Sequence, residues 1–455
     1  MKDKAHPSSF TLHPSSFILY DWVMPASPPA PNLRNAYIFL VFNAIAFQMA
    51  LSSPIVLFAR DLGASSFAIG ILTGVLPMMM GLQLPFARYA ERVGYRTIHV
   101  YAYFARTSGI ICFALLAWFA ANQMITTTMA TVLLVITMTI LSIFRGIASG
   151  TWLPWIAMIV PRENRLDFLS NERICNTGAA VGAMLLASAL LSVRNNLANY
   201  AIVFAIGGLT CGISTYFLAK MPQPRLSSER LNAPPLALRN VLADADFRRF
   251  LTFNIAVQLV VGAMPAFVTV FLREVLAIES SWILIATAGA LLAGVIVIQR
   301  VRYQFDKHGS LYYLRLVLRW WFGSLLAWLC LSVLPFGPGA WWIGLFATVM
   351  SLILMVITGG FGSLFDLSIS RLVMNQIGDR EGSPMFFAMH GMLANLAAAF
   401  SPMAWGALID GTRGAHVTLS GVTVTHFTYF FVGQWVLLIV VWWGLRRLRE
   451  PISDN

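Results

Sequence analysis

The sequence predicts an all-α membrane protein with twelve transmembrane helices in two pseudo-symmetric six-helix bundles. Its 455 residues are 58% hydrophobic and 11% charged, with a mean hydropathy of +0.73. A soluble protein of this length has about a quarter charged residues. Apolar runs of about 20 residues, the length that crosses ~30 Å of hydrocarbon, recur along the chain. Several features of the first half also recur in the second half, and an internal repeat of this kind predicts two similar bundles.

Apolar periodicity and helix-breaking residues place twelve spans along the chain. We expect them at residues 36–58, 67–86, 97–119, 124–148, 174–191, 200–218, 250–271, 282–298, 311–334, 341–364, 385–409 and 427–445.

The longest polar segment between spans, residues 219–249, predicts a cytoplasmic linker. It divides an N-terminal bundle over 34–218 from a C-terminal bundle over 250–448. Residues 1–33 contain a repeated HPSSF and the Pro-rich PASPPAP, so we expect a disordered tail, with Met24 as an alternative start of translation. Residues 449–455 form a short C-terminal tail.

The distribution of basic residues predicts the orientation. With the N-terminus in the cytoplasm, only four of the 31 Lys and Arg residues fall in outer loops, namely Arg60, Arg194, Arg273 and Arg413. Cytoplasmic loops carry an excess of Lys and Arg, so we expect a multi-pass protein of the bacterial inner membrane with both termini in the cytoplasm. The basic residues are spread between spans, so the net charge of +12 predicts contact with the lipid bilayer and no nucleic-acid partner.

Ordered matches relate the two halves of the chain. The matching features, first half before second, are Phe42-Asn43 with Phe253-Asn254, Pro54 with Pro265, Arg60-Asp61 with Arg273-Glu274, and Glu91-Arg92-x-Gly94 with Asp306-Lys307-x-Gly309. Parallel six-span repeats are typical of transporters whose cargo site lies between the two halves.

The segment ARYAERVGYR at 87–96 resembles the loop motif between spans 2 and 3 of the major facilitator superfamily, Gly-x-Leu-Ala-Asp-Arg-x-Gly-Arg-Lys. Ala90, Arg92 and Gly94 match, while Glu91 and Arg96 replace the Asp and the Lys. The resemblance implies that family's fold over residues 36–448, and a secondary transporter whose bundles rock about a central site. It also implies a conformational latch made by Arg88, Glu91, Arg92, Gly94, Arg96, Asp306, Lys307 and Gly309. For Arg88 and Arg96, the alternative is simple anchoring at the inner lipid surface.

Polar side chains within spans are costly in lipid, so they face a cavity or another helix. Spans 1 and 7, which the resemblance places on the central path, carry Asn43, Gln48, Asn254 and Gln258. These amides either line a cargo cavity or form hydrogen bonds that join helices. Asn176 in span 5 is a further polar insertion.

Three more residues are candidates for the cargo site. Arg145, in LSIFRGIASG, resembles the arginine of the family's span-4 motif, which the resemblance associates with proton coupling or charge handling; alternatively, its side chain reaches the lipid surface. In span 11, His390 either titrates during transport or forms a structural hydrogen bond, and Asn395 is a further polar residue. Arg106 and Arg319 lie at similar depths in spans 3 and 9, where we expect them to bind helix-end carbonyls.

The charges within the spans indicate the cargo. No Asp or Glu lies in the middle of an expected span, and Asp366 and Asp410 lie at the ends of spans 10 and 11. Arginines without buried acids favour an anionic or neutral cargo over a cationic one. We therefore predict a monomeric secondary transporter that moves a small solute by rocker-switch alternating access, with coupling to a proton or ion left open.

Two other classes of function are alternatives to transport. The main alternative is a transporter-like membrane scaffold, assembly factor or sensor that does not transport. The sequence contains no metal-spaced His/Cys cluster, nucleophile elbow or phosphate loop, so we expect no enzyme, no catalytic residue, no metal and no cofactor.

Overall fold

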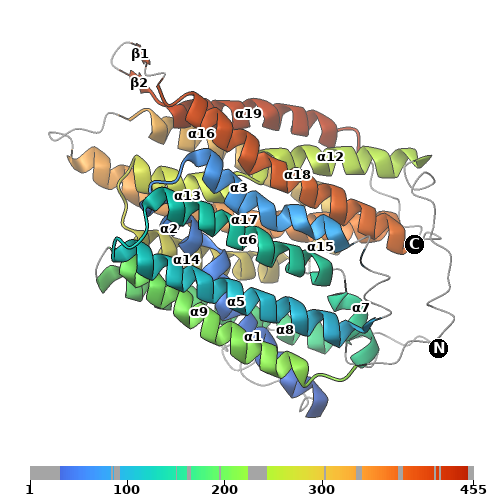
Figure 1. The fold of residues 1–455 in the computed structure, drawn as a ribbon. Coiled ribbons are helices and arrows are strands. Elements are labelled where there is room, and N and C mark those ends of the chain that lie inside the picture. The colour runs from blue at the N-terminus through green and yellow to red at the C-terminus, as the bar shows by residue number, and fades with distance from the viewer. Residues whose placement is uncertain are drawn as a thin grey trace, which may run out of the picture.

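The structure is a computed structural model that describes residues 31–83, 86, 93–149, 151–160, 165–193, 196–223, 243–301, 304–334, 341–377, 383–414, 417–419 and 422–448. Apart from one small hairpin, the described elements are helices (Figure 1). All twelve expected spans are present as helices, so the predicted fold class is confirmed. Eleven spans are long and apolar enough to cross a membrane, and residues Ser66–Leu82 form a shorter apolar one.

The first half contains α1 (Pro31–Leu51), α2 (Ser53–Asp61), α3 (Ser66–Met79), the 3-10 helix η1 (Met80–Leu82), α5 (Tyr95–Ala121), α6 (Thr127–Ser149), α7 (Trp152–Ile159), α8 (Arg165–Val193) and α9 (Leu197–Ala219). The second half contains α12 (Ala245–Val261), α13 (Met264–Glu274), α14 (Ser280–Val301), α15 (Phe305–His308), α16 (Ser310–Ser332), α17 (Trp341–Ile377), α18 (Ser383–Gly411) and α19 (His426–Leu445). Strands β1 (Val417–Leu419) and β2 (Val422–Val424) form an antiparallel hairpin before α19.

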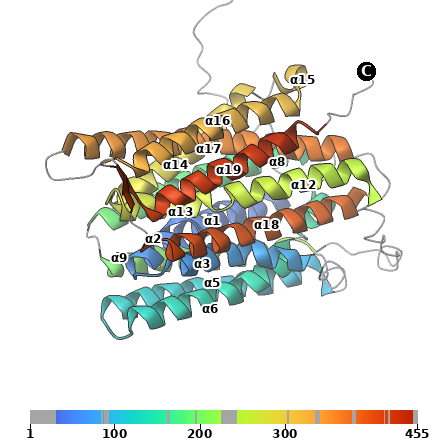
Figure 2. The same cartoon turned by 90° about the horizontal axis from the view of Figure 1, so that it is seen from above.

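The helices form two bundles that follow the two halves of the chain (Figures 1 and 2). In the first bundle, α1 packs on α8 and α9, while α5 packs on α6 and α9. In the second, α12 packs on α18 and α19, while α14 and α16 pack on α17. Two helix pairs form the most extensive contacts between the bundles: α3 with α18, and α8 with α14. These contacts place any central cavity between helices of both halves.

The first and seventh spans are interrupted at corresponding positions. α1 ends at Leu51 just before α2, and α12 ends at Val261 just before α13. Pro54 and Pro265 lie in the first turns of α2 and α13, where proline is tolerated although it cannot continue the preceding helix. The interruptions bring α2 and α13 against each other between the bundles.

Two helices differ from their expected boundaries, and both differences change the site. α17 continues to Ile377 because Phe365, Ile369, Leu372 and Val373 extend its buried face. The expectation that Asp366 lies at the end of span 10 is therefore wrong, since this residue lies within the helix. α8 begins at Arg165, nine residues before the expected 174, so Arg173 lies inside a helix as well.

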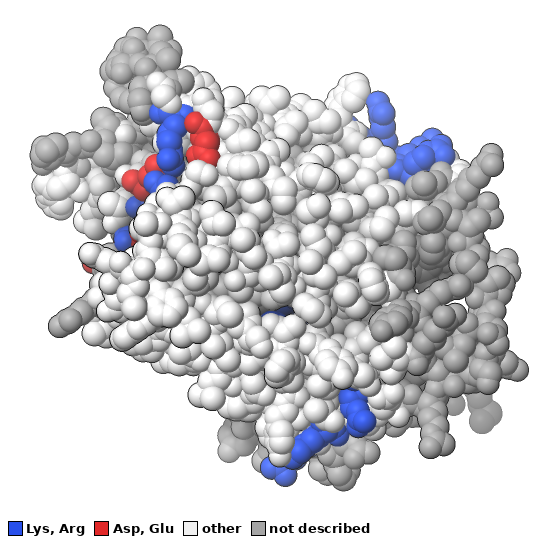
Figure 3. Space-filling view, viewed as in Figure 1, with Lys and Arg blue, Asp and Glu red and all other residues white. Residues whose placement is uncertain are grey.

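Charged side chains are segregated on the molecular surface. On the face shown in Figure 3, acidic and basic side chains occur together at one end, whereas the described residues at the other end and the lower edge show basic side chains alone. A broad uncharged surface lies between these regions. Large apolar side chains such as Tyr101, Phe104 and Trp118 are exposed, which suits a surface that contacts lipid tails.

Candidate functional site

A cavity of ≈ 300 Å³ lies mainly in the first bundle, between α1, α5, α6 and α8, and Leu291 of α14 contributes from the second bundle. Its lining residues are Asn43, Ala44, Phe47, Gln48, Tyr103, Arg106, Arg145, Arg173, Asn176, Thr177, Ala180 and Leu291. We call this the arginine cavity, because three of its side chains are arginines, each from a different helix.

Neighbouring polar and aromatic groups hold two of these arginines. The Arg106 Nη1 donates to Asn43 Oδ1 at 2.7 Å, and its Nη2 lies 3.4 Å from the Asn43 carbonyl oxygen. The guanidinium also lies 5.2 Å from the Tyr103 ring centroid. Arg145 lies over the Phe47 ring at 4.9 Å. Aromatic faces stabilise cations without neutralising them, so both guanidinium groups keep their capacity to bind an anion.

Few acidic groups balance the arginine cavity. No Asp or Glu is among the lining residues that the structure describes. Two carboxylates interact with nearby residues: the Asp366 carboxylate interacts electrostatically with Arg173, and Glu172 hydrogen-bonds to Trp152. Three cationic side chains against these two carboxylates leave the region with a net positive charge.

Two buried polar atoms at the cavity lack hydrogen-bond partners among the described residues. These are Arg106 Nε, in a side chain only 2% exposed, and Gln48 Oε1. An unsatisfied buried polar group costs about 1–3 kcal/mol, so such atoms in a cavity indicate a place for water or a ligand.

A second cavity of ≈ 210 Å³ adjoins the first and shares Tyr103, Arg106 and Arg145 with it. Its remaining lining residues are Met80, His99, Ala102, Ala148, Ser149 and Trp152. The buried His99 ring stacks on Trp155 at 5.2 Å, and its Nε2 lies 2.9 Å from Thr151 Oγ1. We call this the aromatic cavity, and it can accept an apolar or flat group beside the arginines.

The structure separates the predicted site residues into two groups. Asn43, Gln48 and Arg145 line the arginine cavity. Asn254, the repeat equivalent of Asn43, is buried, and its Nδ2 lies 2.8 Å from Nε2 of His390, which stacks on Phe250. This contact joins α12 to α18 within the second bundle.

Two further candidates also lie away from the cavities. Asn395 donates to the Gly391 carbonyl of its own helix at 2.8 Å. Gln258 is half-buried on α12, where its carbonyl accepts a hydrogen bond from the Gly262 N–H. Neither residue is among the lining of the two cavities. The described site is therefore asymmetric, with its polar groups concentrated in the first bundle.

Two of the three arginines in the cavity are not predicted there from the sequence: Arg106 is expected to bind helix-end carbonyls, and Arg173 is not among the predicted site residues. The pattern of α8 contains a signal for the second, because Arg173, Asn176, Thr177 and Ala180 recur at the i, i+3, i+4, i+7 spacing of one helix face. This spacing includes Arg173 only if the helix begins before residue 173, whereas the expected span begins at 174. Arg319, predicted to resemble Arg106, is exposed on α16.

Only part of the predicted latch falls in the described structure. Arg88, Glu91 and Arg92 lie outside the described residues, as does the side chain of Asp306 in α15; Arg96 and Lys307 are exposed. Gly94 and Gly309 precede α5 and α16 with φ values of 99° and 75°, a conformation that favours glycine. The repeat thus preserves a backbone turn at these two positions.

Reciprocal ion pairs join the two bundles at the end of the molecule where α2 and α13 finish. The Arg60 Nη2 lies 2.7 Å from Glu274 Oε2, and Arg273 Nε lies 2.9 Å from Asp61 Oδ1. We call these four residues the closure cluster. Their side chains are 17–20% exposed, so water screens them less than it screens surface pairs.

Other polar contacts surround the closure cluster. Tyr200 of α9 donates to Asp61 Oδ2 at 2.8 Å, and Arg413 lies 3.5 Å from Glu274 Oε1. Asp410 of α18 accepts from the backbone N–H groups of Ser66 and Phe67 at 3.0 and 2.7 Å. Each of these contacts either crosses between the bundles or holds an acid that pairs across them, so this end of the molecule is closed.

No group of three or more His, Cys, Asp or Glu side chains among the described residues could hold a metal ion. The described cavities are lined by arginine, amide and aromatic groups.

No family model and no curated protein matches this chain. Solved structures do resemble it. The nucleoside transporter NupG is 13% identical with a TM-score of 0.65, covering 92% of this chain and 98% of that chain. A bacterial homologue of the iron transporter ferroportin, in an inward-facing state, is 12% identical with a TM-score of 0.66, covering 91% and 98%. A D-xylose-proton symporter is 15% identical with a TM-score of 0.65, covering 93% and 99%.

These similarities show the fold, which is that of the major facilitator superfamily. These proteins are named for a nucleoside, iron and D-xylose, which differ in charge and chemistry. Fold likeness therefore says nothing of this chain's cargo, which has to be argued from its own cavities.

Proposed function

Because the chain has the major facilitator fold, we propose that it is a secondary transporter that moves a small organic anion by alternating access. The observation that carries the proposal is the arginine cavity, where Arg106, Arg145 and Arg173 lie around one space. Arg106 is buried and Arg145 is half-buried, and a cationic side chain removed from water is costly unless an opposite charge compensates it. An anionic cargo supplies that charge, and arginine binds carboxylate or phosphate groups through two parallel hydrogen bonds.

The aromatic cavity supports a cargo with a flat or apolar part. Tyr103 and Trp152 line it beside Arg106 and Arg145, so a ring placed there would lie next to an anionic group on the arginines. His99 Nδ1 is buried and has no hydrogen-bond partner among the described residues, so a polar ring atom could bind it. An anion bearing an aromatic ring therefore fits this pair of cavities better than a simple inorganic anion.

The arrangement of the bundles supports a transport cycle. The closure cluster shuts one end, and the predicted orientation places that end outside the cell. Most of the cavity lining belongs to the first bundle, while Leu291 belongs to the second. Rocking of the bundles would therefore break the closure cluster and change access to the arginines without dismantling the site.

The alternative is a membrane scaffold with a transporter-like fold, and the cavity argues against it. A scaffold has no need for buried polar atoms without partners, such as Arg106 Nε and Gln48 Oε1, beside an internal space. Such groups reduce stability unless they serve binding. The arginine cavity thus favours transport over a purely structural role.

The proposal is tested by a thermal-shift screen of the purified protein, because a ligand that binds the folded state raises its apparent stability. The panel pairs aromatic carboxylates and phosphates with neutral amides and cationic amines of the same shape. We expect an anionic ligand to raise the melting temperature of the wild type, and Arg145→Gln or Arg173→Gln to abolish the shift.

Arg319→Gln is the matched control, because Arg319 is expected at a depth in the membrane similar to that of Arg106 but lies outside both cavities. Counterflow of the labelled ligand in proteoliposomes then separates transport from binding alone. A response to neutral or cationic ligands only would contradict the anionic cargo, and binding without counterflow would favour the scaffold.

A further inference from the structure

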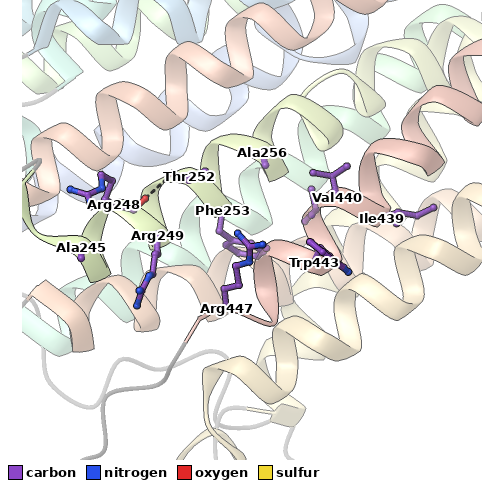
Figure 4. Close-up of a pocket in the computed structure, with 12 residues that line it drawn as sticks. Ala245, Arg248, Arg249, Thr252, Phe253, Ala256, Ile439, Val440, Trp443 and Arg447 are labelled. Atoms are coloured by element: carbon purple, nitrogen blue, oxygen red, sulfur yellow. Dashed lines mark hydrogen bonds between the residues drawn. The ribbon is translucent and has the colours of Figure 1, made fainter.

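A groove of ≈ 560 Å³ runs along the outer surface of the second bundle, between α12 and α19 (Figure 4). It is independent of the cargo site, since it shares no lining residue with either cavity. Figure 4 shows Arg248 and Arg249 towards one end and Val440 and Ile439 towards the other, with Arg447 between them, near Phe253. The groove therefore has a basic end and an apolar end, and we call its apolar part the apolar track.

The basic end carries a net positive charge. Arg249 pairs with Asp246 at 3.2 Å, but both side chains are largely exposed, so this pair is weak. The Asp244 carboxylate accepts from the Phe247 N–H and caps α12. Neither acid is among the groove-lining residues, whereas three arginines are. An anionic group at this end would therefore meet several cationic donors.

The apolar end faces outward rather than into the bundle. Val440 is 59% exposed and Trp443 is 62% exposed. Eight residues separate Arg248 from Ala256, so at 1.5 Å per residue the track extends roughly 12 Å from the arginines. Arg447 also lies over the Trp443 ring at 5.3 Å, and Trp and Arg together are typical of the membrane–water interface.

The basic end lies at the end of the molecule opposite the closure cluster. α12 begins next to Arg248 and leads into α13, which ends at Glu274; α19 begins at His426, 3.7 Å from Glu274, and ends next to Arg447. The arginines of both helices therefore lie towards the same surface of the membrane, with Arg447 nearer the middle of the groove than Arg248 and Arg249 (Figure 4).

We propose that this groove binds an anionic phospholipid. The phosphate lies among the three arginines, and an acyl chain follows Phe253, Ala256 and Val440 along the groove. Arginine is suited to phosphate, and basic pockets between membrane helices bind anionic headgroups. An amphiphile satisfies both ends of the groove, whereas a free phosphate would leave the apolar track empty. The bound lipid would join the first and last spans of the second bundle at their basic ends.

Native mass spectrometry of the full-length protein in detergent tests this proposal, with phosphatidylglycerol and phosphatidylcholine of identical chains as probes. We expect the protein to bind phosphatidylglycerol preferentially. Each arginine near an anionic lipid contributes about fivefold in affinity, so Arg248→Gln with Arg447→Gln should lower binding by roughly 30-fold. Arg446→Gln is the control, because this exposed neighbour is not among the groove-lining residues.

A second variant separates the groove from simple surface charge. Ala256→Trp fills the apolar track and leaves every arginine in place, so it should also weaken phosphatidylglycerol binding by several-fold. Monodisperse elution of each variant shows that it is folded. The proposal is overturned if phosphatidylcholine binds equally well, if Arg446→Gln matches the double variant, if Ala256→Trp has no effect, or if millimolar inorganic phosphate displaces the lipid.

Discussion

Arg60 of α2 and Glu274 of α13 form an ion pair with an Nη2–Oε2 distance of 2.7 Å. In the internal repeat, Arg60 corresponds to Arg273, and Asp61 corresponds to Glu274. Beside them, Asp61 pairs with Arg273 at 2.9 Å. In each dipeptide, Arg60-Asp61 and Arg273-Glu274, the arginine therefore pairs with the acid of the other dipeptide. A two-fold symmetric interface has the same arrangement, because one surface patch there binds a copy of itself. A duplicated segment with adjacent opposite charges can close on its own equivalent.

Charge reversal in the closure cluster should open this end of the molecule. Asp61→Arg places two cations together and should favour the open state, because losing a partly buried ion pair costs about 1 kcal/mol or more, roughly fivefold in the equilibrium. Combining it with Arg273→Asp restores opposite charges and should recover most of the closure. The Tyr200 hydroxyl, which donates to Asp61, can accept a hydrogen bond instead.

Cross-linking measures this closure directly. The hydroxyls of Ser53 and Thr287 lie 3.4 Å apart across the bundles. Ser53→Cys with Thr287→Cys, in a background without the native cysteines, should cross-link efficiently in the parent, several-fold less with Asp61→Arg, and again efficiently with the charge swap. Equal cross-linking in all three proteins would show that the ion pairs do not control closure.

The close packing of glycines between α3 and α18 allows a second test of the same closure. A Cβ at Gly70 would collide with the Pro402 backbone, and one at Gly406 would collide with the Ser66 backbone. Gly70→Ala should therefore separate the two helices and lower the yield of the Ser53–Thr287 cross-link. Gly81→Ala is the control, since its new Cβ would meet side-chain atoms only at 3.9 Å. Identical yields for the two variants would mean that α3 and α18 can shift without opening this end.

The sequence predicts the fold well because its signals are local and periodic. Apolar runs give the spans, and Pro54 and Pro265 mark the repeat-related places where two spans are interrupted. The site is harder, because it depends on which helix faces meet. Arg173 enters the cavity only because α8 begins at Arg165, and Asn254 is paired by His390 from a distant helix. The repeat correspondence of Arg60 with Arg273 is visible in the sequence, yet their reciprocal pairing requires the bundles to be placed side by side.

The two equivalent asparagines should behave differently when removed. Asn43→Ala takes away the acceptor that holds Arg106 in the cavity, so we expect weaker anion binding in the thermal-shift assay. Asn254→Ala takes away the partner of His390 and should lower the free energy of unfolding by about 1 kcal/mol, with little change in ligand affinity. Comparing melting temperatures with and without ligand separates these effects. If Asn254→Ala weakens ligand binding as much as Asn43→Ala, the cargo site extends into the second bundle.

An anionic cargo would compete with Asp366 for Arg173, because the Asp366 carboxylate and that guanidinium attract each other electrostatically across the two bundles. Asp366→Asn removes the negative charge and leaves a side chain of similar size. We therefore expect tighter binding of an anionic ligand, by about fivefold for one released charge pair of roughly 1 kcal/mol. Isothermal titration calorimetry of the wild type, Asp366→Asn and Asp366→Asn with Arg173→Gln gives the comparison. The gain should disappear in the double variant, since no arginine is then released at this position. Weaker binding by Asp366→Asn would instead mean that Asp366 positions Arg173 for the cargo.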